Sequence, residues 1–245
     1  MASTIIYGKH AVAALIANAP GRIQNLYVAP SALSEFEELA AARGLRIEPF
    51  TPSTLNRELE GAVHQGVVAR ASLSALMQDY NAFIKDLPVT PATSLVMLNE
   101  ITDPYNVGAI IRSAAAFGAS GVLIPSHNQA PVTGIVAKAS AGTVFSIPIV
   151  GINNENQTIE DLKKKGFWIY GLAGEGANEL TKEKFDAPAC FVVGSEGEGL
   201  RYKTREHCDI LLRIPMHTRV ESLNASVSAA VVLSAWATQH GDALE

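Results

Sequence analysis

The chain has few cysteines and no excess of positive charge. Cys190 and Cys208 are the only cysteines among 245 residues, and neither has the paired Cys or His spacing of a zinc site. Both lie in or beside apolar runs, so we expect structural thiols in a reducing cytoplasm and no bound metal. The formal net charge of −5 disfavours non-specific binding of nucleic acid through clustered Lys and Arg, although it leaves room for a local basic face.

Patterns that would place the chain in a membrane are also scarce. No basic leader followed by a short apolar run opens the sequence, so residues 1–6 are not expected to act as a signal peptide. The longest uncharged stretch, 222–239, carries two amides and several hydroxyl side chains, which is typical of a buried helix rather than a lipid-facing one. With 48% hydrophobic residues, the chain can bury a substantial core in one large domain or two smaller ones.

The glycine patterns of common nucleotide-binding folds are missing as well. Residues 194–199 read Gly-Ser-Glu-Gly-Glu-Gly, which is neither the Gly-x-Gly-x-x-Gly pattern nor a phosphate-binding P-loop. A nucleotide-dependent dehydrogenase is therefore disfavoured. Three glycines in six residues still indicate either a tight turn or a backbone that passes close to a ligand.

What the sequence does contain is an alternation of helix and strand patterns. In a first unit, 1–75, the periodicity predicts helices at 9–18, 34–43 and near Leu55, and strands at 25–28, 45–47 and 66–69. This unit has the size of a small α/β domain. Residues 76–92, which include Pro88 and Pro91, are predicted to form a partly helical connector that ends in an extended linker.

The second unit, 93–245, has the pattern of an open parallel sheet. Continuous apolar runs predict six buried strands, at 95–98, 121–124, 145–150, 168–170, 191–193 and 210–214. Helical patterns such as 159–165 lie between most of them, so helices are expected on both faces of the sheet. Sheets of this kind bind their ligands at the carboxyl ends of the strands.

Three blocks of polar and glycine residues follow such strand ends. In the first, 99–114, the residues predict Asn106 as a helix N-cap and Arg112 on the first turns, off the apolar stripe of the helix. The helix dipole favours anions there, so Arg112 is either a functional group that grips a phosphate or a surface residue in a salt bridge.

The second and third blocks lie at 191–201 and 214–228. The second holds Glu196 and Glu198, and a solvent-exposed position is the simplest expectation for Glu198. The third runs from Ile214-Pro215-Met216 to Ser222-Leu223-Asn224, before a helix whose nearly uncharged body, 227–237, is expected to be buried. Its polar residues either cap that helix or bind a ligand.

In this order, the three blocks resemble the three motifs of the SpoU-type RNA ribose 2'-O-methyltransferases, in the SPOUT superfamily. Residues 7–12 and 64–69 are similar to the N-terminal RNA-binding extension of bacterial members that methylate a guanosine of large-subunit ribosomal RNA. The resemblance covers nearly the whole chain. It implies a small N-terminal α/β RNA-binding domain, a C-terminal parallel-sheet SPOUT domain with a trefoil knot, and a homodimer.

The resemblance also implies the chemistry. The methyl donor would be S-adenosylmethionine and the acceptor a ribose 2'-hydroxyl of RNA, with a guanosine of 23S ribosomal RNA favoured. The same reaction on transfer RNA, or an RNA-binding protein that keeps the fold without turnover, stays open. The implied catalytic residues are Arg112, Asn106, Glu196, Ser222 and Asn224, and the implied cofactor contacts are Gly194, Ile214, Met216, Leu223 and Asn224.

One segment departs from the family pattern. Family members usually carry a glycine in a small-residue loop after the Pro-Met pair, whereas this chain has His217-Thr218-Arg219-Val220-Glu221. Bulkier side chains there would alter the loop over the cofactor.

Overall fold

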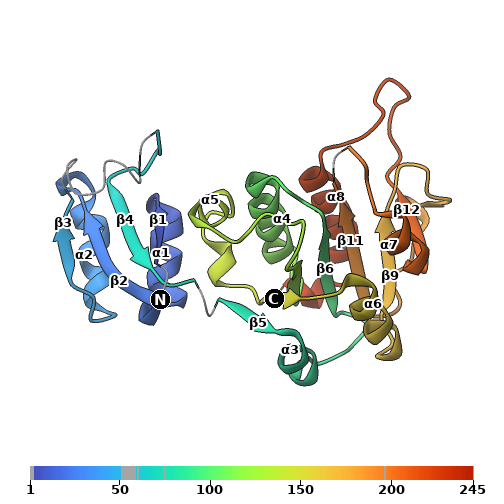
Figure 1. Cartoon of the computed structure of the whole chain (residues 1–245), viewed down its shortest axis with the longest axis horizontal. Helices are drawn as coiled ribbons and strands as arrows, with labels where there is room; N and C mark the ends of the chain where they lie inside the picture. The colour runs from blue at the N-terminus through green and yellow to red at the C-terminus, as the bar shows by residue number, and fades with distance from the viewer. Residues whose placement is uncertain (1–2, 51–58, 60, 74–75, 196, 245) are drawn as a thin grey trace.

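The computed structural model describes residues 3–50, 59, 61–73, 76–195 and 197–244, and it contains two sheets (Figure 1). The N-terminal sheet has the strand order β1 (Thr4–Tyr7), β4 (Val67–Ala71), β2 (Ile23–Val28) and β3 (Ile47–Pro49). Strand β4 is antiparallel to both β1 and β2, while β2 and β3 are parallel. Helices α1 (Lys9–Asn18) and α2 (Leu33–Ala41) confirm the first two predicted helices, and the one predicted near Leu55 lies outside the described residues.

The second sheet has eight strands, and its recorded pairings are all parallel. Their order across the sheet is β10 (Asn178–Glu179), β12 (Ile210–Arg213), β9 (Trp168–Leu172), β11 (Ala189–Gly194), β6 (Ser94–Asn99), β7 (Gly121–Pro125), β8 (Ile149–Ile152) and β5 (Met77–Asp79). The predicted parallel sheet is thus confirmed.

Three details of that prediction were wrong or missing. Strand β8 begins at Ile149, whereas the apolar run predicted a strand from residue 145. The start of that run belongs instead to a 3-10 turn, η3 (Thr143–Phe145). Strands β5 and β10 were not predicted, since they have three and two residues and no apolar run to reveal them.

Helices cover both faces of the large sheet. Strand β6 shows why: Val96 and Leu98 pack with one apolar cluster, and the alternate residues Leu95 and Met97 pack with the other. The first cluster includes residues of α4 (Pro104–Ala116), α5 (Gly134–Ala139) and α8 (Ala225–Ala237). The second includes α3 (Tyr80–Asp86) and α6 (Glu155–Lys164), and α7 (Tyr202–His207) packs beside α6. Both faces are therefore buried, as parallel sheets require.

The two units pack closely against each other. Residues of α1 and β1 belong to the same apolar cluster as α4, α5 and α8. Two glycines permit the approach: a Cβ on Gly134 would lie 2.0 Å from the Ile5 carbonyl oxygen, and one on Gly142 would lie 2.4 Å from the Ala14 Cβ. The N-terminal unit is consequently docked on the second unit and not merely tethered to it.

The segment 76–92 also contributes to the larger unit. Strand β5 pairs with β8 at the sheet edge, and Phe83 and Ile84 of α3 pack into the second apolar cluster. Short 3-10 turns occur at η1 (Pro20–Arg22), η2 (Pro30–Ala32), η4 (Leu180–Lys182) and η5 (Gly241–Leu244). Among the described helices, none is long and apolar enough to cross a membrane. The trefoil knot stays a prediction of the family resemblance.

Candidate active site

The parallel strands bring the three sequence blocks to one edge of the sheet. Strands β9, β11 and β12 end beside one another there, and a cavity of about 350 Å³ opens beyond them. Five of the predicted site residues line this cavity together: Gly194, Ile214, Met216, Ser222 and Leu223. The cavity is also lined by Leu172, Ala173 and Gly174, which the sequence reading missed although they too lie at a strand end, that of β9.

The loop after β11 closes tightly on itself. Ser195 and Gly199 exchange backbone hydrogen bonds of 3.1 and 3.0 Å, and Gly199 has a φ of +68°. A Cβ on Gly194 would lie 2.3 Å from the backbone of Gly199, so only glycine fits there. Glu198 is exposed, as expected, while Glu196 lies outside the described residues. This loop therefore forms one wall of the cavity from backbone atoms.

The walls are suited to a ligand that is part apolar and part polar. Leu172, Leu212 and Ile214 provide apolar surface, and the glycine segments bring backbone atoms to the cavity wall. Carboxylates of Glu175 and Glu198 also line the cavity, and Glu175 forms an ion pair with Arg205. Arg205 lines the cavity too, which leaves the carboxylate of Glu198 for a cation. Apolar walls for a purine, backbone polar groups for its edge and this carboxylate together fit S-adenosylmethionine.

Helix α4 carries the other predicted catalytic residues, and its start differs from the prediction. The N-cap is Asp103, whose Oδ1 accepts a hydrogen bond of 2.9 Å from the Tyr105 N–H, and Pro104 is the first helical residue. Asn106 is thus inside the helix and is not its N-cap, because the helix starts three residues earlier than predicted. Its side chain is buried.

Arg112 is exposed, whereas Val107, Ile110, Ile111 and Ala114 are fully buried, which confirms that Arg112 lies off the apolar stripe. It lies eight positions after Pro104, so it is not on the first turns as predicted. Its distance from the helix start removes the argument from the helix dipole, which acts within the first turn. The exposed position of Arg112 is compatible with both alternatives, a functional group and a surface residue.

Asn224 connects α4 with α8. Its Oδ1 caps α8 by accepting hydrogen bonds from the Ser226 and Val227 N–H groups, at 2.8 and 3.4 Å. Its Nδ2 donates a hydrogen bond of 3.1 Å to Asn106 Oδ1. The sequence reading set capping against ligand binding. Asn224 does cap α8, and the same side chain also holds α8 against α4.

The predicted site residues consequently fall into two groups. One group lines the cavity, while Asn106, Arg112 and Asn224 are absent from its described lining. Helices α4 and α8 pack against each other beside it. The outer face of α8 is not buried in the single chain: Val227 is 46% and Val231 36% exposed, so the expectation of a fully buried helix was wrong for this face.

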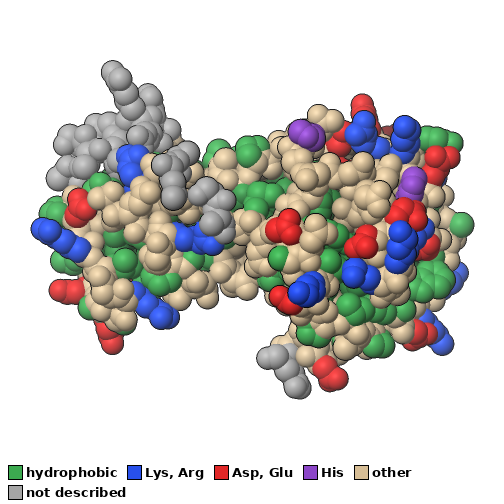
Figure 2. Space-filling view, turned by 60° about the horizontal axis from the view of Figure 1, so that its bottom comes forward, with side chains coloured by type: hydrophobic (Ala, Val, Ile, Leu, Met, Phe, Trp, Pro, Cys, Tyr) green, Lys and Arg blue, Asp and Glu red, His purple; other side chains and the backbone are tan. Residues whose placement is uncertain are grey.

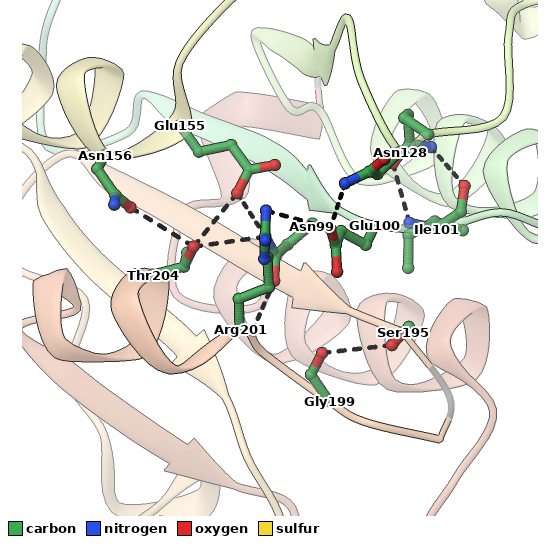
Figure 3. A network of polar contacts seen from close by, with 11 residues as sticks. Asn99, Glu100, Ile101, Asn128, Glu155, Asn156, Ser195, Gly199, Arg201 and Thr204 are labelled. Carbon is green, nitrogen blue, oxygen red and sulfur yellow. Dashed lines mark hydrogen bonds and ion pairs between the residues drawn. The ribbon is translucent and has the colours of Figure 1, made fainter.

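A polar network that sequence reasoning missed lies at the same sheet edge (Figure 3). Asn99, fully buried at the end of β6, accepts a hydrogen bond of 3.0 Å from the Arg201 N–H and donates one of 2.5 Å to Glu155 Oε2. Arg201 pairs with Glu100 at 3.2 Å. Asn99 gave a hint, because an amide at the end of a buried strand needs partners, but the sequence did not show which ones.

The altered loop lies at the mouth of the cavity. Residues 217–221 connect β12 to α8 and are exposed, and a turn is closed by the Val220 N–H on the His217 carbonyl at 3.0 Å. Met216 and Glu221, at the two ends of this loop, line the cavity. The departure from the family pattern therefore affects the entrance and leaves the glycine wall unchanged.

The cysteines lie away from this chemistry. Cys190 is fully buried in β11, and burial strongly raises the pKa of its thiol. Burial, with a smaller contribution from Asp209, raises the pKa of Cys208 to about 12. Both thiols are therefore protonated at neutral pH, as structural cysteines are.

Comparison with known proteins defines the class. Residues 93–234 match the SpoU rRNA Methylase family, and residues 5–77 match the RNA 2'-O ribose methyltransferase substrate binding domain. The first match covers more than half of the chain. The chain belongs to the SpoU rRNA Methylase family.

Individual relatives are similar over nearly the full length. The 23S rRNA (guanosine-2'-O-)-methyltransferase RlmB of Yersinia pestis is 37% identical over 248 residues, which is 98% of each chain. The enzyme of the same name from Pseudomonas putida is 37% identical over 93% of each chain. The structure of the SpoU methyltransferase AviRb from Streptomyces viridochromogenes, in complex with AdoMet, matches with a TM-score of 0.80 at 25% identity, over 97% of this chain and 90% of that one.

Proposed function

We propose that this protein transfers the methyl group of S-adenosylmethionine to the ribose 2'-hydroxyl of a guanosine in 23S ribosomal RNA. The observation that carries the proposal is the cavity beside β11 and β12, where segments of the second and third family motifs converge. The full-length similarity to enzymes named for this reaction supports the choice of acceptor. The expected location of such an enzyme is the bacterial cytoplasm, where its RNA is made.

The cofactor, when bound, supplies a methyl group on a sulfonium that is already a good leaving group. The remaining task of the protein is to align the hydroxyl with that methyl and to manage one proton. Gly194, Ile214, Met216 and Leu223 would hold the cofactor through apolar contacts and backbone groups. Ser222 at the cavity wall would help to orient the hydroxyl. Glu196, which lies outside the described residues, would have the same task by the family resemblance.

Arg112 would carry the central catalytic role. A guanidinium is effectively always protonated in proteins, so we favour stabilisation of the developing alkoxide, together with positioning of a phosphate, over a role as general base. Asn106 and Asn224 would orient Arg112 by fixing α4 against the start of α8.

We further propose a homodimer that covers the outer face of α4 and α8. The valines exposed on α8, Val227 and Val231, are one helical turn apart and form an apolar stripe. Arg112 is exposed and does not line the cavity of its own chain. A second copy on this face would both cover the stripe and bring a guanidinium to the cavity.

The division of labour follows from the two sheets. The unit 1–75 would select the RNA, 76–92 would connect it, and 93–245 would bind the cofactor and perform the reaction. On the face seen in Figure 2, Lys and Arg side chains alternate with Asp and Glu over the larger unit. Such mixed charge, with a net charge of −5, fits recognition of a particular RNA site better than general attraction to RNA.

Mapping of 2'-O-methylation tests the proposal in the cell. Ribosomal and transfer RNA from a strain lacking the gene are compared with the RNA of the parent strain. The proposal expects one guanosine of 23S RNA to lose its 2'-O-methyl group and to regain it on complementation. Loss confined to a transfer RNA would identify the alternative acceptor, and an unchanged methylation map would contradict the proposal.

A further inference from the structure

A second cavity, of about 580 Å³, lies at the same sheet edge beside the polar network. It is lined by the loop after β7, the start of α6 and the segment 201–204. Arg201 lines this cavity and its neighbour Leu200 lines the proposed cofactor cavity, so the two are separated by the loop that follows β11. None of the described lining residues is shared between them.

The floor of this cavity is built from buried polar groups. Glu155 Oε2 accepts hydrogen bonds from Asn99 Nδ2 at 2.5 Å and from Thr204 Oγ1 at 3.2 Å. Asn99 is fully buried and Thr204 is 2% exposed, so the carboxylate is held in a fixed position. Figure 3 shows the other carboxylate oxygen of Glu155 pointing away from these bonds. Burial raises the pKa of Glu155, and the two hydrogen bonds offset part of that rise.

The backbone at the rim is strained. Glu100 and Asn128 have φ values of +58° and +54°, which residues other than glycine rarely adopt. The two are joined by a hydrogen bond of 2.9 Å from Asn128 Nδ2 to Glu100 Oε1. Arg201 binds the same carboxylate oxygen at 3.2 Å. Strain of this kind, maintained by side-chain bonds, is concentrated at ligand sites.

The charges determine what this cavity can accept. The guanidinium of Arg201 is paired with the carboxylate of Glu100, which neutralises much of its charge, and Glu155 is the carboxylate that lines this cavity. A phosphate would be repelled by that carboxylate, whereas a neutral group with N–H donors would be attracted. Exposed Tyr202 and Lys203 lie at the mouth, where an aromatic ring can stack on a base and an ammonium can contact a phosphate.

We infer that this cavity binds a guanine base of the substrate RNA, belonging to a nucleotide other than the one that is methylated, with Glu155 accepting hydrogen bonds from its Watson–Crick edge. Guanine is the RNA base that presents two adjacent N–H donors, N1–H and the 2-amino group, on that edge. The separation of this cavity from the cofactor cavity assigns it to a neighbouring nucleotide. The inference rests on the proposed function for the RNA, but the site can be tested without catalysis.

Binding of mononucleotides to the full-length protein is the test. Guanosine, inosine and adenosine 5'-monophosphates are titrated by NMR or calorimetry in saturating S-adenosylhomocysteine, which blocks the cofactor cavity. Inosine lacks the 2-amino group, so we expect the guanine nucleotide to bind at least about fivefold more tightly than the inosine nucleotide. Glu155→Gln should abolish this preference, because its amide would present a donor where the carboxylate presents an acceptor.

A matched control lies on the same helix. Glu160→Gln makes the same chemical change on α6, at a residue that faces His207 at 3.9 Å and does not line the cavity, and it should keep the preference for guanine. Equal binding of the three nucleotides by the wild type, or an unchanged preference in Glu155→Gln, would overturn the inference. Binding that disappears only when S-adenosylhomocysteine is added would locate the nucleotide in the cofactor cavity and would also overturn it.

A kinetic measurement separates this inference from the proposed function. Glu155→Gln should raise the KM for RNA while leaving the affinity for S-adenosylmethionine unchanged. If the wild type methylates no RNA, the proposed function fails while the nucleotide titrations still decide the inference. If the wild type methylates RNA and Glu155→Gln has the same KM, only the inference fails.

Discussion

Asn224 Nδ2 donates a hydrogen bond of 3.1 Å to Asn106 Oδ1, joining two residues that are 118 positions apart in the sequence. The bond fixes the start of α8 against α4, the helix that carries Arg112. Because Asn224 also caps α8, its two amide atoms link the stability of α8 to the position of the helix that carries Arg112.

Two substitutions of Asn224 separate these roles. Asn224→Ser keeps a good N-cap but is too short to reach Asn106, whereas Asn224→Ala loses both. We expect urea unfolding to show a loss of about 1 kcal/mol for the serine variant and about 1 kcal/mol more for the alanine variant. Methyl transfer should fall in both variants. Full activity in Asn224→Ser with a loss in Asn224→Ala would show that capping alone matters.

Arg112 can be removed without opening a cavity, because its side chain is exposed. Arg112→Ala should fold normally and bind S-adenosylmethionine nearly as well as the wild type, yet lose at least about a hundredfold in single-turnover methyl transfer. Arg112→Lys keeps the charge but not the planar fork. Little rescue would point to bidentate contacts, and recovery at high pH would support a general base. If Arg112→Ala transfers methyl groups at the wild-type rate, the catalytic role is contradicted and Arg112 is a surface residue without a part in the reaction.

The proposed dimer face is tested on α8. Val231→Glu places a carboxylate on the exposed stripe, and burying that charge in an interface would be costly, so light scattering at micromolar concentration should report a monomer with reduced methyl transfer. Val89→Glu is the control, since Val89 is similarly exposed, at 40% against 36%, but lies in the segment 76–92. A wild-type protein that is a stable, active monomer would contradict the proposed dimer.

Glu155 gives a pH dependence of stability. Its pKa is raised in the folded state mainly by burial, so between its unfolded and folded pKa values the folded protein holds the proton more tightly. Its contribution to stability is therefore present at low pH and is lost as the pH rises through the folded pKa. Compared with Glu155→Gln, the melting temperature of the wild type should fall as the pH rises through that window and stay lower above it. A difference in melting temperature between the wild type and Glu155→Gln that does not change with pH would contradict the raised pKa of Glu155.

Much of the fold could be predicted, because buried strands and amphipathic helices leave periodic apolar patterns. Strand β6 and helix α6 illustrate this, since both were found within a few residues of their ends. Strands β5 and β10 could not be found, because they are only three and two residues long, mostly polar, and become strands only by pairing with a sheet formed elsewhere.

The site was predictable to the extent that its residues form contiguous blocks. Gly194, Ile214 and Leu223 line one cavity because parallel strands end at a shared edge, and their contacts with a cofactor stay a prediction. The start of α4 was misplaced, since Asp103 and Asn106 are both good capping residues and only the backbone decides between them. Glu155 could not be found, because its contact with Asn99 spans 56 residues and depends on the packing of α6.

The central claim is methyl transfer to a ribose oxygen of RNA, and the position of a labelled methyl group tests it most directly. Purified protein is incubated with S-adenosylmethionine carrying a labelled methyl group and 23S ribosomal RNA from the strain lacking the gene, and the product is fully hydrolysed in alkali. A 2'-O-methyl group blocks cleavage at the neighbouring phosphodiester, so the label should appear in one alkali-resistant dinucleotide that begins with guanosine. Two results would contradict methyl transfer to a ribose oxygen. One is label in mononucleotides, which would indicate a methylated base, and the other is no incorporation of label into the RNA.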